Sequence, residues 1–146
     1  MHSANTSPLG KTLWQFDSSD SGFPSAAAVS TEPEYPFVVV GDDFGVIRCI
    51  NTNSGKVVWD LSMEGEISGG PTILHSSETP VVLVGSQDAT LVCLQLTDGK
   101  ILWRHEIADQ IRCSPTVDSS EDGHRVFLAG CDSTLHILDA MNGKTV

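Results

Sequence analysis

The feature that most constrains this chain is a Gly-Lys pair that returns at a fixed distance. It stands at Gly10-Lys11, Gly55-Lys56, Gly99-Lys100 and Gly143-Lys144, in steps of 45, 44 and 44 residues. A tryptophan follows four residues after the first three glycines, at Trp14, Trp59 and Trp103. A period of this length is typical of stacked supersecondary units, each of which buries its apolar faces against its neighbours.

Each unit offers four short strand candidates bounded by turn residues. In the second unit these are residues 56–61, 70–75, 81–86 and 90–96. The run Val81-Val82-Leu83-Val84 is continuously apolar, which favours a strand buried on both faces. No window shows a sustained helical period. The sequence therefore predicts an all-β fold made of β-propeller blades, each a sheet of four antiparallel strands.

The repeat also sets the domain organisation. Residues 1–9 are predicted to be a disordered tail, and residues 10–146 to be repeats, with units at about 10–54, 55–98 and 99–142 and a fourth starting at 143. The segment 11–16 is predicted to be the outer strand of a preceding blade, and the last unit lacks its own. A closed propeller needs at least about four blades, so we expect an open arc of about three. Such an arc is a segment of a larger ring, or it associates with copies of itself.

The charge of the chain narrows its partners. The 146 residues include 19 acidic and 8 basic side chains, for a net charge of −11. An acidic surface repels phosphate backbones and anionic lipids, so we predict no nucleic-acid partner. No apolar run approaches membrane-spanning length, so we predict no membrane insertion. The first residues lack the basic and apolar regions of a signal peptide, which fits a cytoplasmic protein and equally a mature or truncated part of an exported one.

The four cysteines fall into two groups. Cys49 and Cys93 occupy the same repeat position, which Ile137 fills in the next unit, so we predict a buried apolar position. Cys113 and Cys131 flank the innermost hairpin of the last unit and should lie nearly opposite each other. They form either a disulfide or two buried free thiols, and the thiols are favoured because free cysteine is commonly a core residue.

The repeat resembles that of a known family. Residues 49–59 read Cys-Ile-Asn-Thr-Asn-Ser-Gly-Lys-Val-Val-Trp, and residues 93–103 read Cys-Leu-Gln-Leu-Thr-Asp-Gly-Lys-Ile-Leu-Trp. This pattern is similar to the tryptophan-docking motif of the pyrroloquinoline-quinone (PQQ) type repeat, roughly Ala-x-Asp-x-x-Thr-Gly-Lys-x-x-Trp. Asp139 keeps the acidic position, which Asn51 and Gln95 replace. The resemblance covers residues 10–146 and implies that the Gly, Lys and Trp residues dock one blade on the next, so Gly-Lys is not a phosphate loop.

The resemblance implies three kinds of function. Quinoprotein dehydrogenases of this family form eight-bladed rings and hold PQQ and Ca²⁺ with acidic and amide side chains, a stacking Trp and often two adjacent cysteines. This chain has no adjacent cysteines and uses each Trp in a docking motif, so we predict no cofactor in it. Non-enzymatic members in bacterial outer-membrane assembly use the repeat as a protein-binding scaffold, which is the prediction we favour and which would place the chain outside the cytoplasm. The alternatives are a fragment of a quinoprotein dehydrogenase and an accessory or sensor propeller of a larger protein.

Other constellations carry less chemistry. His105, His124, His136 and Asp132 share one unit, but their spacing matches no metal-ligand pattern, so we expect surface histidines and no metal. Glu64, Glu66, Glu106 and Asp109 are expected to be loop charges. Neither a Ser-His-Asp arrangement nor a pair of carboxylates stands out. We therefore predict no catalytic residue.

Overall fold

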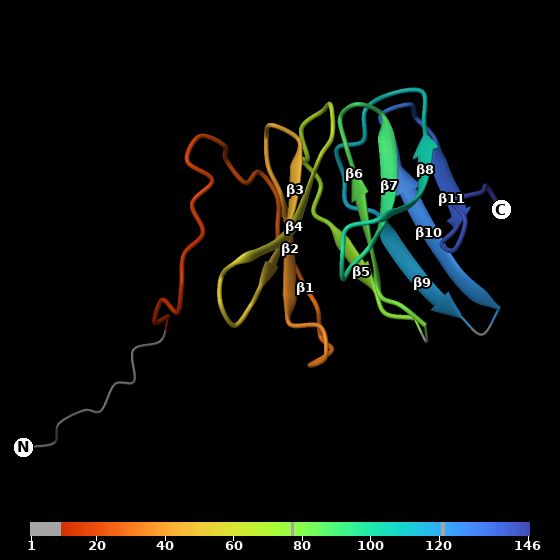
Figure 1. The fold of residues 1–146 in the computed structure, drawn as a ribbon. Helices are drawn as coiled ribbons and strands as arrows, with labels where there is room; N and C mark the ends of the chain where they lie inside the picture. The colour runs from red at the N-terminus through yellow and green to blue at the C-terminus, as the bar shows by residue number, and fades with distance from the viewer. Residues whose placement is uncertain (1–9, 77, 121) are drawn as a thin grey trace, which may run out of the picture.

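The computed structural model describes residues 10–76, 78–120 and 122–146. Within these residues there is no helix, and the strands form three antiparallel sheets side by side (Figure 1). Blade 1 contains β1 (Ala28–Val29), β2 (Phe37–Gly41), β3 (Val46–Asn51) and β4 (Val57–Ser62), in that order. Blade 2 contains β5 (Thr72–Leu74), β6 (Val81–Gly85), β7 (Thr90–Gln95) and β8 (Ile101–Glu106). Blade 3 contains β9 (Thr116–Ser120), β10 (Gly123–Ala129) and β11 (Leu135–Asp139).

The predicted all-β fold is confirmed: among the described residues, three antiparallel sheets form an open arc that does not close into a ring. The tail predicted at residues 1–9 lies outside the described residues. The described residues therefore contain no helix that could span a membrane.

The hairpins of the three blades close in the same way. The turns between β2 and β3, β6 and β7, and β10 and β11 each contain one residue with positive φ, at Gly45 (87°), Ala89 (70°) and Ser133 (64°). An aspartate in each turn accepts a backbone N–H of the same turn, as the Asp88 carboxylate does from Thr90 at 2.9 Å. Such side-chain-to-backbone bonds stabilise tight reversals and make the non-glycine residues tolerable there.

The core consists of two clusters, one at each blade junction. Blade 1 packs on blade 2 through Val39, Ile47, Cys49 and Trp59 against Val82, Val84, Val92 and Leu94. Blade 2 packs on blade 3 through Leu83, Leu91, Cys93 and Trp103 against Val126, Leu128, Leu138 and Ala140. Alternate residues of β6 and β7 therefore face opposite junctions, which is why the apolar run in β6 is continuous.

The strand predicted at residues 11–16 is wrong, because these residues adopt no strand. A strand forms where its backbone N–H and C=O groups pair with a neighbouring strand, and among the described residues none lies beside this segment. It instead lies against blade 1. At the other end, a single bridge joins Thr145 to Leu138, so only the beginning of an outer strand is present in blade 3.

Candidate functional site at the blade junctions

Each tryptophan of the repeat lies against the glycine of the following unit. The indole nitrogens of Trp14, Trp59 and Trp103 donate to the backbone oxygens of Thr52, Leu96 and Ala140, at 2.7, 2.7 and 2.9 Å. Each acceptor stands three residues before a repeat glycine. Trp59 and Trp103 are buried, with 8% and 9% of their surface exposed, and Trp14 is half-buried. One side chain thus supplies a large apolar contact and a directed hydrogen bond to every junction.

The glycines leave room for these indoles. Gly55, Gly99 and Gly143 have φ of 69°, 73° and 70°, a left-handed conformation that favours glycine. A Cβ atom on Gly143 would lie 2.4 Å from Cε3 of Trp103, and one on Gly55 would lie 2.9 Å from Cδ2 of Trp14. A Cβ atom on Gly10 would meet no atom within 4 Å. The first Gly-Lys pair therefore has no tryptophan against it among the described residues.

The lysines of the motif point away from the junctions. Lys11, Lys56, Lys100 and Lys144 are exposed, and the structure uses the backbone of the last three. Their carbonyl oxygens accept the N–H groups of Asn51, Gln95 and Asp139, at 2.9, 2.8 and 2.8 Å. These bonds close the turn that presents the glycine to the indole. The structure gives no reason for a lysine side chain at this position.

A buried ion pair, which the sequence analysis missed, lies on the face of blade 1 opposite blade 2. Arg48 donates to the Asp42 carboxylate at 2.6 Å, and the Ser21 hydroxyl donates to the same oxygen at 2.7 Å. The Arg48 guanidinium also lies 5.7 Å from the ring centroid of Phe16. Burial raises the pKa of Asp42, but the bonds from Arg48, Val46 and Ser21 and the charge of Arg48 outweigh it and leave the pKa below its ordinary value. The only signal in the sequence is an arginine where the next unit has Val92.

Two of the three histidines meet at the junction of blades 2 and 3. His136 lies 2.8 Å from the Asp132 carboxylate, and its ring centroid is 5.9 Å from that of His105. Burial raises the pKa of Asp132, whereas the hydrogen bond with His136 and two backbone N–H groups lower it, with a net lowering. His124 lies apart, against Ser119. Within the described residues, no group of three His, Cys, Asp or Glu side chains is arranged to hold a metal ion.

All four cysteines are free thiols in this structure. Cys49 and Cys93 are buried, and burial raises the pKa of each to about 12. Cys113 is half-buried and its thiol donates to the carbonyl of Ala129, whereas Cys131 is exposed. The candidate pair Cys113 and Cys131 is thus present as two thiols, which is the alternative favoured above, although Cys131 is not buried.

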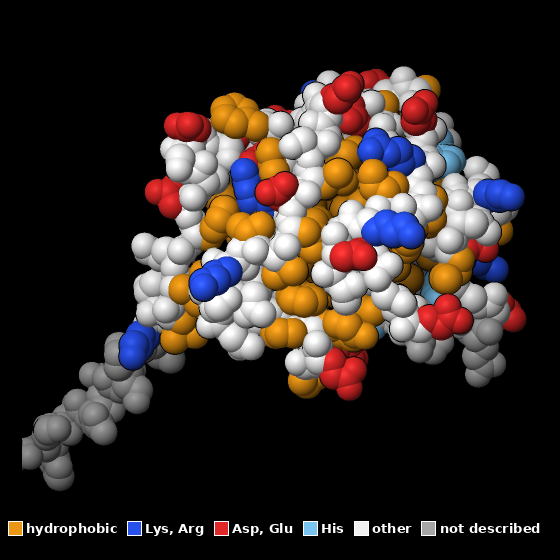
Figure 2. Space-filling model, in the orientation of Figure 1, with side chains coloured by type: hydrophobic (Ala, Val, Ile, Leu, Met, Phe, Trp, Pro, Cys, Tyr) orange, Lys and Arg blue, Asp and Glu red, His pale blue; other side chains and the backbone are white. Residues whose placement is uncertain are grey.

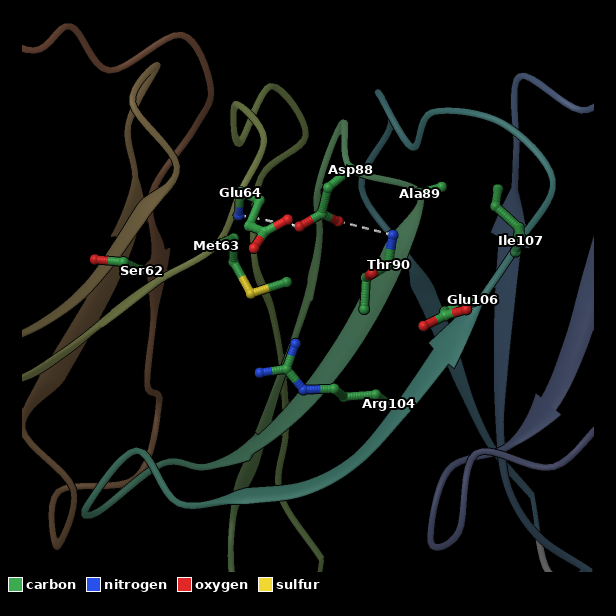
Figure 3. Close-up of a pocket in the computed structure, with 9 residues that line it drawn as sticks. All are labelled: Ser62, Met63, Glu64, Asp88, Ala89, Thr90, Arg104, Glu106 and Ile107. Atoms are coloured by element: carbon green, nitrogen blue, oxygen red, sulfur yellow. Dashed lines mark hydrogen bonds between the residues drawn. The ribbon is translucent and has the colours of Figure 1, made fainter.

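A cleft of about 470 Å³ lies at the junction of blades 1 and 2 (Figure 3). Met63 and Thr90 are its buried residues, and Glu64, Asp88, Arg104 and Glu106 are its charged residues. The Asp88 carboxylate accepts the N–H of Glu64 at 3.1 Å and that of Thr90 at 2.9 Å. Asp88 therefore ties the segment that leaves blade 1 to the turn that opens β7.

The tryptophans of the chain all lie in the contacts with repeat glycines, and its cysteines lie at separate positions. The three indoles are all used against Gly55, Gly99 and Gly143, which leaves none for stacking on a quinone ring. The four cysteines are spread over separate positions, with no adjacent pair.

Blades of four strands joined by recurring Trp-on-Gly contacts define the class of protein: a PQQ-like repeat β-propeller, here as an open arc. The family model described as "Outer membrane protein assembly factor BamB" matches residues 4–77 and 43–146, and the chain belongs to this family. Among the curated proteins none matches.

Solved structures agree on the fold. BamB from Moraxella catarrhalis is 20% identical, with a TM-score of 0.69 over 92% of this chain and 39% of that one. The computationally designed Ika4 protein is 18% identical, with a TM-score of 0.72 over 94% of this chain and 78% of the design. The designed Ika8 protein is also 18% identical, with a TM-score of 0.65 over 85% of this chain and 35% of that one. The chain thus spans about two fifths of the length of the Moraxella protein.

Proposed function

We propose that this chain is a non-catalytic PQQ-like repeat module that serves as a protein-interaction scaffold. The observation that carries the proposal is the repeated contact of tryptophan on glycine. Because of this contact, the most distinctive residues of the repeat have a structural role between blades. The description of the family model is that of an assembly factor, and this supports a role in binding other proteins. Because a fold alone does not decide function, the proposal needs a direct test.

The surface available to partners consists of turns and blade edges. The turn between β2 and β3 exposes Phe44, which has 67% of its surface accessible, where the turns of the other blades carry aspartates. Variable loops on a rigid frame are where proteins commonly carry binding residues. Blade 3 adds an apolar face: Leu135 is 61% exposed, whereas its equivalent in blade 2, Leu91, is buried under blade 3. We expect a further blade, from the same or a second chain, to cover that face.

Photo-crosslinking in the source cells tests the scaffold role. A photoreactive residue at Phe44 or Met141, both exposed, is expected to capture a defined partner protein. The same label in a Gly99→Ala background should lose that product, because the blade junction is disrupted. No specific product from either position would overturn the scaffold role. Reduction of a dye that depends on added PQQ and Ca²⁺ would overturn the non-catalytic assignment.

A further inference from the structure

We infer that the cleft between blades 1 and 2 binds a cationic side chain, lysine or arginine, of a partner protein. The inference rests on the proposed scaffold function and adds to it the place and the chemistry of one contact. It is carried by the charge of the cleft, by the hydroxyl of the largely buried Thr90, which points into it, and by a small apolar patch beside them.

The carboxylates of Glu64, Asp88 and Glu106 surround the cleft, and none of them forms an ion pair within the described residues. Arg104 lies in the same cleft but does not pair with them, so three negative charges face one positive charge. A cleft with an excess of negative charge attracts a ligand of the opposite sign, because its walls focus the field. Figure 2 shows that acidic side chains also gather along the upper edge of the molecule.

Thr90 supplies the second, independent observation. Only 9% of its surface is exposed, and its hydroxyl makes no hydrogen bond to another described residue. In Figure 3 its side chain extends into the cleft beside that of Met63. The hydroxyl oxygen is accessible from the cleft, because among the described residues the only buried side-chain oxygen without a partner is that of Ser25. It can therefore accept a hydrogen bond from an ammonium or guanidinium group that enters the cleft.

The cleft also suits the stem of a long cationic side chain. Met63 is 7% exposed and Ile107 half-buried, and together they give the mostly polar cleft a small apolar patch. Lysine and arginine lay their methylene groups on such surface while the charged head reaches polar partners. The head would then lie among the carboxylates, of which Asp88 is held in place by two backbone N–H groups.

The arrangement does not follow from the repeat itself. The residues with positive φ align the three turns, so that Asp88 corresponds to Phe44 in blade 1 and to Asp132 in blade 3. Phe44 carries no charge, and Asp132 is already bonded to His136. Thr90 corresponds to Val46, which has no hydroxyl, and to Thr134 in blade 3, whose hydroxyl donates to the Asp132 carbonyl at 3.4 Å. The unpaired carboxylates and the hydroxyl therefore meet at the junction of blades 1 and 2 as a property of this sequence.

Amide chemical shifts of the ¹⁵N-labelled chain test the inference at low salt. The probe is the peptide acetyl-Gly-Lys-Gly-amide, with acetyl-Gly-Gln-Gly-amide as its neutral control. The expected result is saturable shifts at the N–H groups of Glu64 and Thr90, which report on Asp88, with the lysine peptide alone. Free spermidine is titrated in parallel, and binding at this cleft as tight as or tighter than that of the peptide would overturn the assignment to a protein side chain.

Charge-matched variants separate the cleft from the general acidity of the chain. The double variant Glu64→Gln and Glu106→Gln removes two exposed ion pairs with the peptide. It should therefore weaken peptide binding by about fivefold. The control is the double variant Glu32→Gln and Glu34→Gln, which removes two exposed charges from the β1–β2 loop, outside the cleft. It should change binding less than about twofold. Arg104→Gln should tighten binding, and Thr90→Val should weaken it.

Equal weakening by both double variants, or shifts scattered over the surface, would overturn the inference. Failure of the scaffold proposal looks different, because it is read from crosslinks at Phe44 and Met141 in cells. A crosslinked partner without peptide binding at the cleft removes only the present inference. Peptide binding without any crosslinked partner leaves a cation site and removes the scaffold role.

Discussion

The indole of Trp59 lies so close to Gly99 that a Cβ atom on the glycine would be 2.6 Å from Cδ2 of the ring. The two residues belong to successive repeats: Trp59 lies on β4 of blade 1, and Gly99 lies in the turn between β7 and β8 of blade 2. The motif is therefore split, in that each unit offers its glycine to the preceding tryptophan and its tryptophan to the following glycine. This is why the spacing of the motif matches the blade and why a single blade cannot satisfy it.

Gly99→Ala is expected to lower the free energy of unfolding by about 2–4 kcal/mol. The left-handed φ of 73° costs a non-glycine residue about 1–2 kcal/mol, and the overlap with Trp59 adds a similar amount. Urea unfolding followed by tryptophan fluorescence measures the difference.

Gly99→Asn separates the two causes, because asparagine tolerates positive φ better than alanine but keeps the Cβ atom. If the contact with Trp59 matters, the asparagine variant stays strongly destabilised. Recovery to near the parent stability would show that the backbone conformation alone explains the glycine.

Trp59→Ala is expected to cost about 3–5 kcal/mol, the usual range for deleting a buried aromatic side chain. Trp59→Phe keeps much of the packing but leaves the Leu96 carbonyl with only the weak thiol donor of Cys49 at 3.8 Å, so about 1–3 kcal/mol is expected. Trp14→Ala should cost less than Trp59→Ala, because Trp14 is only half-buried. A thermal melt of Trp59→Ala that coincides with the parent would contradict the role of the indole at the junction.

Most of the fold could be predicted from the sequence because of the repeat. Turn residues and apolar runs recur every 44 or 45 residues, so an error in one unit is corrected by the others. The four strands predicted for the second unit differ from β4, β5, β6 and β7 by at most two residues at either end, with β5 the shortest at Thr72–Leu74. The exception is the segment 11–16, where the pattern of an outer strand is present without a sheet to join.

The parts that break the repeat were not predictable. The pair of Asp42 and Arg48 depends on Ser21 and Phe16, which fold back from the preceding segment. The cleft joins Glu64 from one blade to Glu106 from the next, and each alone looks like an ordinary loop charge. Such sites depend on residues that differ between units, and a repeat pattern shows only what the units share.

Asp42→Asn is expected to destabilise the protein by about 2–3 kcal/mol at neutral pH, because charged hydrogen bonds from Arg48 and Ser21 are weakened inside the protein. The variant should also change the acid response. The pKa of Asp42 is lower in the folded chain than the ordinary value of about 3.9, so its contribution is complete above that value and is lost as the pH falls through the folded pKa.

Urea unfolding at pH 7 and between about pH 4 and 3 measures that response. The parent should lose more stability over this range than Asp42→Asn does. Glu32→Gln, an exposed change in the β1–β2 loop, serves as the control and should follow the parent. Parallel losses in the parent and Asp42→Asn would contradict the part played by the ion pair.

The thiols should react in two classes. Thiolate is the reactive form, so Cys49 and Cys93, with pKa raised to about 12 and no exposed surface, are expected to resist a thiol reagent at pH 8. Cys131 is exposed and should react first, and Cys113 more slowly because it is half-buried and bonded to Ala129.

Titration with an aromatic disulfide reagent, without reductant, measures both classes. Two thiols are expected in the native chain and all four in urea, and Cys131→Ser should remove the fast phase alone. If urea exposes only two thiols, Cys113 and Cys131 are joined, and their place at the edge of the β9–β10 hairpin then carries a cross-link. Fast reaction of Cys49 in the native chain would instead show that the junction of blades 1 and 2 opens, because that thiol is fully buried in the cluster between these blades.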